Sequence, residues 1–258
     1  MSFPKPQPVG SVTPTAKLID FTETPLKPYY SQPHPFALVI DHLFTPEECE
    51  TLLSLAQSGD NKWEVALINT GNGHQTLAKG IRDCTRIMRD DFDAAGWIYE
   101  RVKPYLEEVK VIDRDSSKWR WIAGHLIGDG TTSWKMTRLN ERLRFLRYTE
   151  DQYFKPHYDG SYVTPDGAES SFLTLHLYLN STGSVSDPGS LRGGATRFLA
   201  PGFRAASRYL DVEAKQGRVL IFQHSQLLHS GEKVSSGVKY TMRTDVMYKK
   251  VAKSKNED

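Results

Sequence analysis

The chain has 258 residues, of which 38% are hydrophobic and 25% are charged, a composition typical of one large soluble domain. Its 33 basic and 31 acidic residues leave a net charge of +2, which argues against nucleic acid or an anionic membrane as a partner. No apolar run reaches the length that spans a bilayer, so no transmembrane helix is expected.

The first 35 residues contain most of the early prolines, in PKPQP, TPLKP and QPHP. This composition predicts an extended arm over 1–35, laid on the protein or left mobile, and a single domain over 36–258. The start also lacks the apolar middle of a secretory signal, and the only cysteines are Cys49 and Cys84. The sequence therefore predicts a cytoplasmic protein without a disulfide framework.

The first half of the domain predicts strands and two helices. FALVIDHLF (36–44) has the composition of a buried strand, and TPEECETLLSLAQSG (45–59) that of a helix with Thr45 as its N-cap. KWEVALINT predicts another strand, followed by the loop GNGHQTLAKG. A second helix is expected over 90–109, where Pro104 kinks or ends it.

From residue 138 the pattern changes to short β-rich runs separated by Gly, Pro, Asp and Ser. The runs are LNERLRFLRY, SFLTLHLYLN, GGATRFLA, RYLDVEAKQG, GRVLIFQH and VKYTMRTDVMY. Strands at this spacing favour a β-sandwich or jelly roll. The expected fold is thus mainly β with supporting helices (α+β), with a jelly-roll core at about 138–250.

Two of these runs have one apolar and one polar face. In SFLTLHLYLN, the side chains of Thr174, His176 and Tyr178 share the polar side of the strand. In VKYTMRTDVMY, the polar side holds Lys239, Thr241, Arg243 and Asp245. Such a face usually meets solvent, but in a jelly roll it can instead line a pocket.

FKPHYDGSY (154–162) places His157 and Asp159 two residues apart, so on a strand both side chains point to one face. With a third, distant histidine they make the 2-His-1-carboxylate triad that holds Fe(II) and leaves coordination positions open. A His-x-Asp alone is more often a chance feature of a surface turn. His224 and His229 are both candidates for the distant ligand.

From about Arg138 to Tyr248 the sequence resembles the prolyl-4-hydroxylase-like Fe(II)/2-oxoglutarate dioxygenases, whose core is a double-stranded β-helix (jelly roll). The matching runs are LNERLRFLRY, FKPHYDG, LTLHLYLN, GGATRFL, GRVLIFQH, LLHSGEKV and GVKYTMRTDVMY. Upstream the resemblance weakens. The order of the two histidines and the aspartate is specific for the superfamily and not for any substrate.

The resemblance implies that His157, Asp159 and His229 are the catalytic iron ligands, and it makes His224 a structural residue. It further implies an enzyme that uses Fe(II), 2-oxoglutarate and O2, with ascorbate as a supporting reductant. Decarboxylation of 2-oxoglutarate to succinate and CO2 would be coupled to hydroxylation, or another oxidation, of an organic substrate. Related halogenases lack the carboxylate, so the presence of Asp159 favours hydroxylation over halogenation.

The co-substrate contacts are also implied by the resemblance. Lys239 matches the basic residue that pairs with the distal carboxylate of 2-oxoglutarate, and Tyr178 matches a tyrosine that hydrogen-bonds the same carboxylate. Tyr148 and Thr174 fall where residues line the pocket. Arg243 is a second candidate for the cation, because related enzymes place it at different distances after the distal histidine.

Three other functions compete with a small-molecule hydroxylase. The substrate could be a prolyl residue in a protein or peptide, the jelly roll could be a cupin-like binding module without activity, or the substrate could be a nucleic acid. The near-neutral charge argues against nucleic acid. Residues 113–135 are interrupted by glycine and serine, which predicts a second, long loop. The insertions at 70–80 and 113–135 favour a covered small-molecule site over an open peptide groove. No oligomeric state is predicted.

Four arginines, Arg82, Arg86, Arg138 and Arg144, are candidates to face the mouth of the pocket, where they would bind an anionic substrate. For each one taken singly, an ordinary solvated or salt-bridged arginine is the simpler interpretation.

Overall fold

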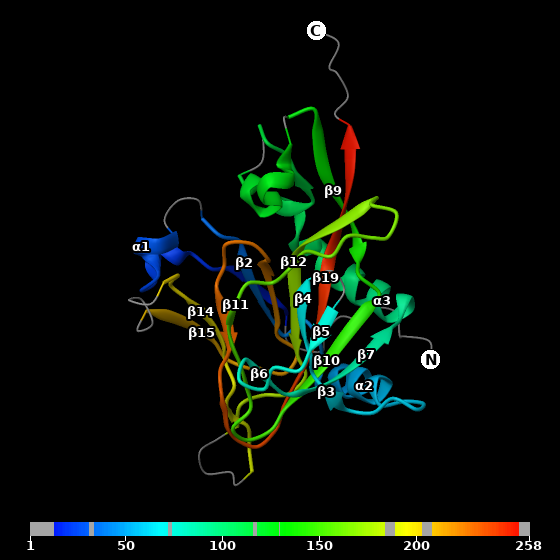
Figure 1. The fold of residues 1–258 in the computed structure, drawn as a ribbon, viewed down its shortest axis with the longest axis vertical. Coiled ribbons are helices and arrows are strands. Elements are labelled where there is room, and N and C mark those ends of the chain that lie inside the picture. The colour runs from blue at the N-terminus through cyan, green and yellow to red at the C-terminus, as the bar shows by residue number, and fades with distance from the viewer. Residues whose placement is uncertain are drawn as a thin grey trace.

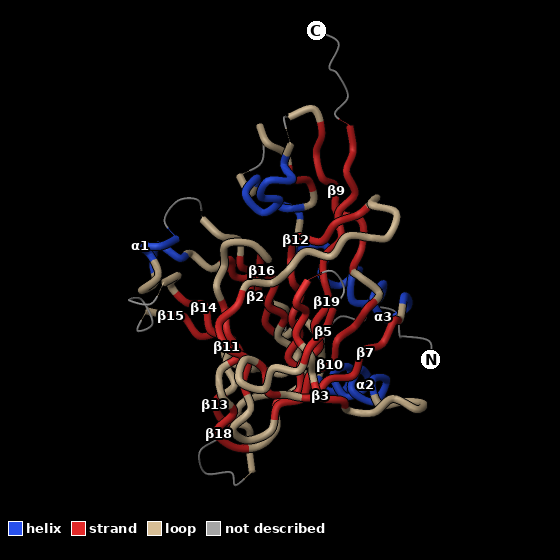
Figure 2. The backbone as a smooth tube through the Cα atoms, viewed as in Figure 1, coloured by secondary structure: helices blue, strands red, loops and turns tan. Residues whose placement is uncertain are grey.

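The structure is a computed structural model that describes residues 13–30, 34–71, 74–115, 118–128, 130–183, 189–202 and 208–252. Within these residues ten strands form a large antiparallel sheet (Figures 1 and 2). Eight strands follow one another in the order β1 (Thr15–Leu18), β2 (Ala37–Asp41), β16 (Val219–Gln223), β12 (Glu169–Tyr178), β19 (Lys239–Ala252), β10 (Arg142–Tyr148), β7 (Thr85–Asp90) and β3 (Glu64–Val65). The long β19 also pairs with β9 (Thr132–Leu139), which in turn pairs with β8 (Val111–Ile112).

A smaller sheet lies beside the large one (Figure 1). Its strands are β15 (Tyr209–Val212), β14 (Thr196–Leu199), β17 (His229–Gly231), β11 (Tyr153–His157) and β6 (Arg82–Asp83), in that order. Two further pairs are β13 (Arg192–Gly193) with β18 (Val234–Ser236), and β4 (Ile68–Gly71) with β5 (His74–Thr76). The predicted fold, mainly β with a jelly-roll core, is confirmed.

Helices cover the face of the large sheet that points away from the small one. α2 (Pro46–Ala56) begins with the predicted Thr45 cap, completed by Glu48 in a capping box. α3 (Phe92–Val102) ends just before Pro104, as predicted, and the chain continues in short 3-10 turns. Their apolar sides pack on the strands in a core that includes Leu52, Ile98, Phe145, Leu175, Met242 and Val246.

The remaining helical segments are short. They are η1 (Phe21–Glu23), α1 (Lys27–Tyr30), η2 (Lys103–Tyr105), η3 (Glu107–Val109) and η4 (Arg120–Ile127). In the part of the chain that the structure describes, no helix has both the length and the apolar character to cross a membrane.

Two predicted loops contain regular structure. The segment 70–80 includes β5, which pairs with β4 as a hairpin, and 113–135 contains η4 and the start of β9. Both were missed because glycines interrupt the sequence pattern, whereas pairing with a neighbouring strand stabilises β5 and β9 in the fold. In the predicted arm, β1 extends the large sheet by pairing with β2; residues 1–12 lie outside the described part.

The inner face of the large sheet carries the predicted polar side chains. His176 on β12 lies opposite Arg243 on β19, and Arg243 lies opposite Arg144 on β10. Two arginines directly across a strand pair repel each other unless an acid lies between them. Asp245 fulfils this role, because its carboxylate oxygens lie 3.0 Å from Arg144 Nη1 and 3.5 Å from Arg243 Nη2.

Candidate active site

The small sheet brings His157, Asp159 and His229 together. β11 and β17 pair so that His157 lies directly opposite His229, with ring centroids 4.3 Å apart. Asp159 follows two residues after His157, and its carboxylate oxygens lie 3.6 Å from His157 Nε2 and 3.7 Å from His229 Nε2. One ligand atom from each residue lies within 4.8 Å of the other two.

Backbone contacts orient both imidazoles toward this centre. Nδ1 of His157 lies 2.8 Å from the carbonyl oxygen of Lys155, and Nδ1 of His229 lies 3.1 Å from that of Leu227. A carbonyl only accepts hydrogen bonds, so each Nδ1 donates its proton and each Nε2 keeps a lone pair. Burial lowers the pKa of His229 to about 4, which keeps this imidazole neutral. The donor set therefore fits a divalent metal ion.

The carboxylate of Asp159 is held by two donors. Thr174 Oγ1 donates to Oδ2 at 2.5 Å, and Arg243 Nη1 lies 3.0 Å from Oδ1. Burial by itself would raise the pKa of this carboxyl, but the Arg243 guanidinium and the two imidazoles outweigh it and hold the pKa well below its usual range. Asp159 is thus an ionised ligand with a fixed orientation.

His224, the other candidate for the distal ligand, lies outside this cluster. It is buried, and its Nε2 lies 3.6 Å from Asp245 Oδ1. Among the described residues, the cluster with metal-ligand geometry contains His229 and not His224.

A narrow inner cavity extends from the triad between the sheets, and its walls include Tyr148, Thr174, His176, Thr196 and Lys239. Lys239 is only 2% exposed, and its ammonium lies 5.3 Å from the centroid of the Tyr148 ring. Among the described residues no carboxylate lies within ion-pair distance of it. Burial lowers the pKa of Lys239 to about 8. The end of the cavity thus holds a buried cation without a counter-ion.

Tyr178 lies next to Lys239, whose ammonium is 5.7 Å from the centroid of the Tyr178 ring. Its hydroxyl donates to Thr196 Oγ1 at 2.7 Å, and its side chain lies behind the cavity wall. Thr196 lines the cavity in its place, a contact for which the sequence carries no signal. His176 also lines it, and its Nε2 is buried without a hydrogen-bond partner among the described residues. The expected contact of Tyr178 with 2-oxoglutarate remains a prediction.

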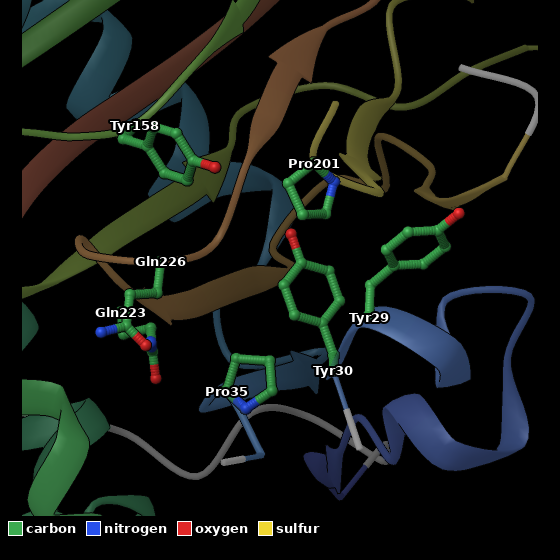
Figure 3. A pocket seen from close by; sticks show the side chains of 7 residues that line it. All are labelled: Tyr29, Tyr30, Pro35, Tyr158, Pro201, Gln223 and Gln226. Atoms are coloured by element: carbon green, nitrogen blue, oxygen red, sulfur yellow. The ribbon is translucent and has the colours of Figure 1, made fainter. Parts of the chain in front are cut away.

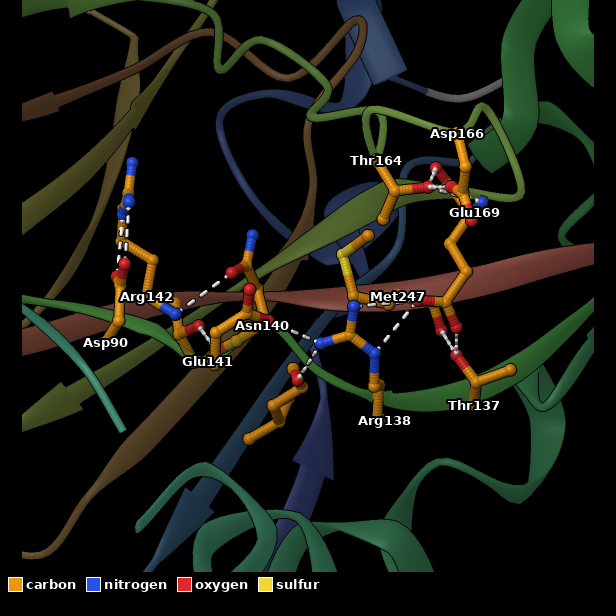
Figure 4. Close-up of polar contacts among 12 residues, drawn as sticks. Asp90, Thr137, Arg138, Asn140, Glu141, Arg142, Thr164, Asp166, Glu169 and Met247 are labelled. Carbon is orange, nitrogen blue, oxygen red and sulfur yellow. Dashed lines mark hydrogen bonds and ion pairs between the residues drawn. The ribbon is translucent and has the colours of Figure 1, made fainter. Parts of the chain in front are cut away.

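On the other side of the triad lies a cleft of about 830 Å³, here called the outer cleft. Residues of β4, β5, β6, β7, β10, β11 and β19 and the segment 158–162 line it. Three of the four candidate arginines are there, namely Arg82, Arg86 and Arg144. Arg138 does not line the cleft and has the simpler role of a salt-bridged arginine, because Glu141 and Glu169 bind its guanidinium at 2.6 and 2.8 Å (Figure 4).

A third pocket, of about 440 Å³, adjoins the outer cleft at Tyr158, which lines both. Figure 3 shows the rings of Tyr29, Tyr30 and Tyr158 around it, with Pro35 and Pro201 nearby. Residues of the predicted N-terminal arm therefore reach the neighbourhood of the candidate active site.

The model of the 2OG-Fe(II) oxygenase superfamily matches residues 143–244, a range that includes the triad, Lys239 and Arg243. The matched region is less than half of the chain, and through it the chain is similar to the 2OG-Fe(II) oxygenase superfamily. It is therefore a 2-oxoglutarate-dependent, non-haem iron oxygenase, and the family implies Fe(II), 2-oxoglutarate and O2 as cofactor and co-substrates.

No curated protein matches the chain. Among solved structures it is similar to a prolyl-4-hydroxylase from Pseudomonas putida, with 15% identity over 81% of this chain and 91% of that one and a TM-score of 0.49. It is also similar to a viral collagen prolyl hydroxylase from Paramecium Bursaria Chlorella virus-1 in a 2OG complex (17% identity, 83% and 96% covered, TM-score 0.44). A third similar structure is that of HygX from Streptomyces hygroscopicus with nickel and 2-oxoglutarate bound. Its identity is 13% over 83% of this chain and 82% of that one, with a TM-score of 0.42.

Proposed function

We propose that the protein hydroxylates, or otherwise oxidises, a small organic substrate, with His157, Asp159 and His229 as the iron ligands. The observation that carries this proposal is the convergence of two imidazole Nε2 atoms and one ionised carboxylate at a single point between the sheets. Iron bound there supplies O2 activation, coupled to decarboxylation of 2-oxoglutarate to succinate and CO2. The protein orients the reactants and excludes water.

Lys239 is the proposed partner of the distal carboxylate of 2-oxoglutarate. A buried ammonium without a counter-ion is costly, and an anionic ligand removes that cost. Lys239 lines the same inner cavity as the triad, so a dicarboxylate bound at the metal can extend its far end toward this side chain. Tyr148 and Thr196 supply hydroxyl groups in the same walls.

Arg243 has a different proposed role, which is to position Asp159. Its Nη1 lies 3.0 Å from Asp159 Oδ1, so the guanidinium is already engaged by the carboxylate of a proposed iron ligand. The prime substrate would then enter through the outer cleft, which meets the inner cavity at His157 and Asp159.

The proposal is tested with the purified full chain, anaerobic Fe(II) and 2-oxoglutarate. The chelate is expected to show a weak visible charge-transfer band, and admission of O2 with ascorbate should yield succinate. Untargeted metabolite turnover under the same conditions would then identify the substrate. If wild-type protein forms neither the band nor succinate, the proposed function is wrong.

A further inference from the structure

The outer cleft is strongly cationic although the chain as a whole is nearly neutral. Five arginines line it, together with two acids, Asp159 and Asp245. Three of the arginines have carboxylate partners: Arg142 with Asp90 at 2.7 Å, Arg144 with Asp245 at 3.0 Å and Arg243 with Asp159 at 3.0 Å. Arg82 and Arg86 are the two cleft arginines without such a partner among the described residues.

Neither Arg82 nor Arg86 has a carboxylate within 4.0 Å among the described residues. Arg82 donates from Nε to Cys84 Sγ at 3.3 Å, and its guanidinium carbon lies 4.7 Å from the centroid of the Phe154 ring. Arg86 donates from Nη2 to the side-chain oxygen of Gln75 at 2.6 Å. Both guanidinium groups are thus oriented by neutral neighbours. Acids act on them only at longer range, Asp159 on Arg82 and Glu64, across the strand pair, on Arg86.

For Arg86 this arrangement costs free energy in the protein alone. Both side chains are partly buried, and like charges close together destabilise each other. Burial lowers the pKa of Arg86, and the nearby Arg82 and Arg144 guanidiniums lower it further, so these cations lie close enough to repel. Such unfavourable charge is typical of a binding site for the opposite charge.

The position of the two arginines is fixed relative to the triad by strand pairing. Arg82 on β6 lies opposite Phe154 on β11, the strand that carries His157, and Arg86 on β7 lies opposite Leu146 on β10. Arg86 lines only the outer cleft, whereas Arg82 also reaches the inner cavity. Under the proposed function, the metal and Lys239 already compensate the negative charge of 2-oxoglutarate. A second anion bound in the outer cleft would supply the close partner that Arg82 and Arg86 lack among the described residues.

We propose that the prime substrate carries an oxyanion group, a carboxylate or a phosphate, which Arg82 and Arg86 bind in the outer cleft. This inference rests on the proposed function, because the triad must hold the iron toward which the substrate's C–H bond is directed. The planar guanidinium fork suits both oxyanions, since each accepts two parallel N–H hydrogen bonds.

The first experiment uses Mn(II) in place of Fe(II) in the full chain saturated with 2-oxoglutarate, and it uses inorganic phosphate and acetate as probes. Mn(II) should enhance the relaxation of the phosphate ³¹P or the acetate ¹³C nucleus in a saturable manner. The probe that saturates at lower concentration indicates which oxyanion the cleft prefers. Arg86→Gln should weaken that binding by at least about tenfold, and Arg86→Lys by less.

Arg89→Gln is the matched control, because Arg89 lies on the same strand but pairs with Asp91 outside the cleft. It should leave probe binding unchanged. Equal binding by wild type and Arg86→Gln, or no saturable binding of either probe, would overturn the inference. The Fe(II)–2-oxoglutarate band of Arg86→Gln, measured in parallel, reports that the variant is folded. If the band forms while the probes fail to bind, the proposed function stands and only this inference fails.

The second experiment compares substrate pools by 2-oxoglutarate-dependent succinate release. Pools of small carboxylates and phosphate esters should stimulate release, whereas the methyl esters of the same carboxylates should not. For the active compound, Arg86→Gln should raise KM by at least about tenfold while KM for 2-oxoglutarate changes little. Equal turnover of a neutral ester, or an unchanged KM in Arg86→Gln, would contradict the proposal.

Discussion

The two ends of the candidate active site both use cations, but they hold them differently. At the inner end a single ammonium, that of Lys239, is buried in a narrow cavity against aromatic rings. At the outer end several guanidiniums line a cleft of about 830 Å³, and acids neutralise most of them. The inner end therefore suits one anion of constant shape, whereas the outer end has room for a larger and more variable molecule.

The choice of cation follows from the same difference. Burial lowers the pKa of Lys239 to about 8, so the inner charge depends on pH near the physiological range. A guanidinium stays charged at any ordinary pH. The outer end should therefore bind an anion at any pH at which the protein is folded. At the inner end Lys239 loses its positive charge above about pH 8.

The largest expected effect comes from changes to the triad, where the two ends meet. His229→Ala should abolish the Fe(II)–2-oxoglutarate charge-transfer band, and Asp159→Gly should reduce succinate formation by more than about a thousandfold. Loss of an outer-shell partner alone typically costs about 10–100-fold, and a ligand should cost more. His224→Ala should retain the band. If it loses the band and His229→Ala keeps it, the ligand assignment is wrong.

Removal of the inner cation should have the next largest effect. Lys239→Ala should raise KM for 2-oxoglutarate by at least about a hundredfold, because loss of one partner of a buried charge pair typically costs ~3–5 kcal/mol. Steady-state kinetics with varied 2-oxoglutarate measure this. Lys233→Ala, which removes an exposed lysine, serves as the control. A normal KM in Lys239→Ala would show that another cation binds the co-substrate.

Replacing Arg243 tests whether this residue positions Asp159 or binds 2-oxoglutarate. Arg243→Ala removes the partner of Asp159 and should weaken Fe(II) binding by about 10–100-fold, the usual cost of losing an outer-shell contact. Activity titrated against Fe(II) concentration measures this, and Arg144→Ala, which breaks a pair with Asp245 instead, should have less effect. A large rise in KM for 2-oxoglutarate with normal Fe(II) affinity would make Arg243 the co-substrate cation.

The smallest expected effect is a dependence on pH. Bound anion favours protonated Lys239, so 2-oxoglutarate should bind most tightly below pH 8 and lose about tenfold per pH unit above it. Burial raises the pKa values of the neighbouring Tyr148 and Tyr178 hydroxyls, so these groups stay protonated in that window; Glu213 and Glu232 act on Lys239 only at longer range. The KM for 2-oxoglutarate, measured from pH 7 to 9, tests this pH dependence. Lys239→Arg should abolish the dependence, and a flat wild-type profile would contradict the assignment.

The sequence predicted strands better than the segments between them. β12 and much of β19 follow from the alternation of apolar and polar residues, and α2 follows from its Thr45 cap. Local pattern predicts loops for β5 and for the start of β9, because the stability of these strands comes from pairing with partner strands. The position of Tyr178 behind the wall depends on its contact with Thr196, which no local signal announces.

The sequence alone determined that His157 and Asp159 stay close together, because only Tyr158 separates them. The expectation that both lie on one face of a strand is wrong, because β11 ends at His157 and the contacts with Thr174 and Arg243 direct the Asp159 carboxylate. Only the tertiary structure brought His229 rather than His224 to them, through the pairing of β11 with β17. It also decided which arginines are neutralised: Glu169 binds Arg138, Asp245 binds Arg144, and no carboxylate reaches Arg86 among the described residues. Ion pairs depend on distances of a few ångströms between residues far apart in the chain, and these distances are set by strand register and sheet packing.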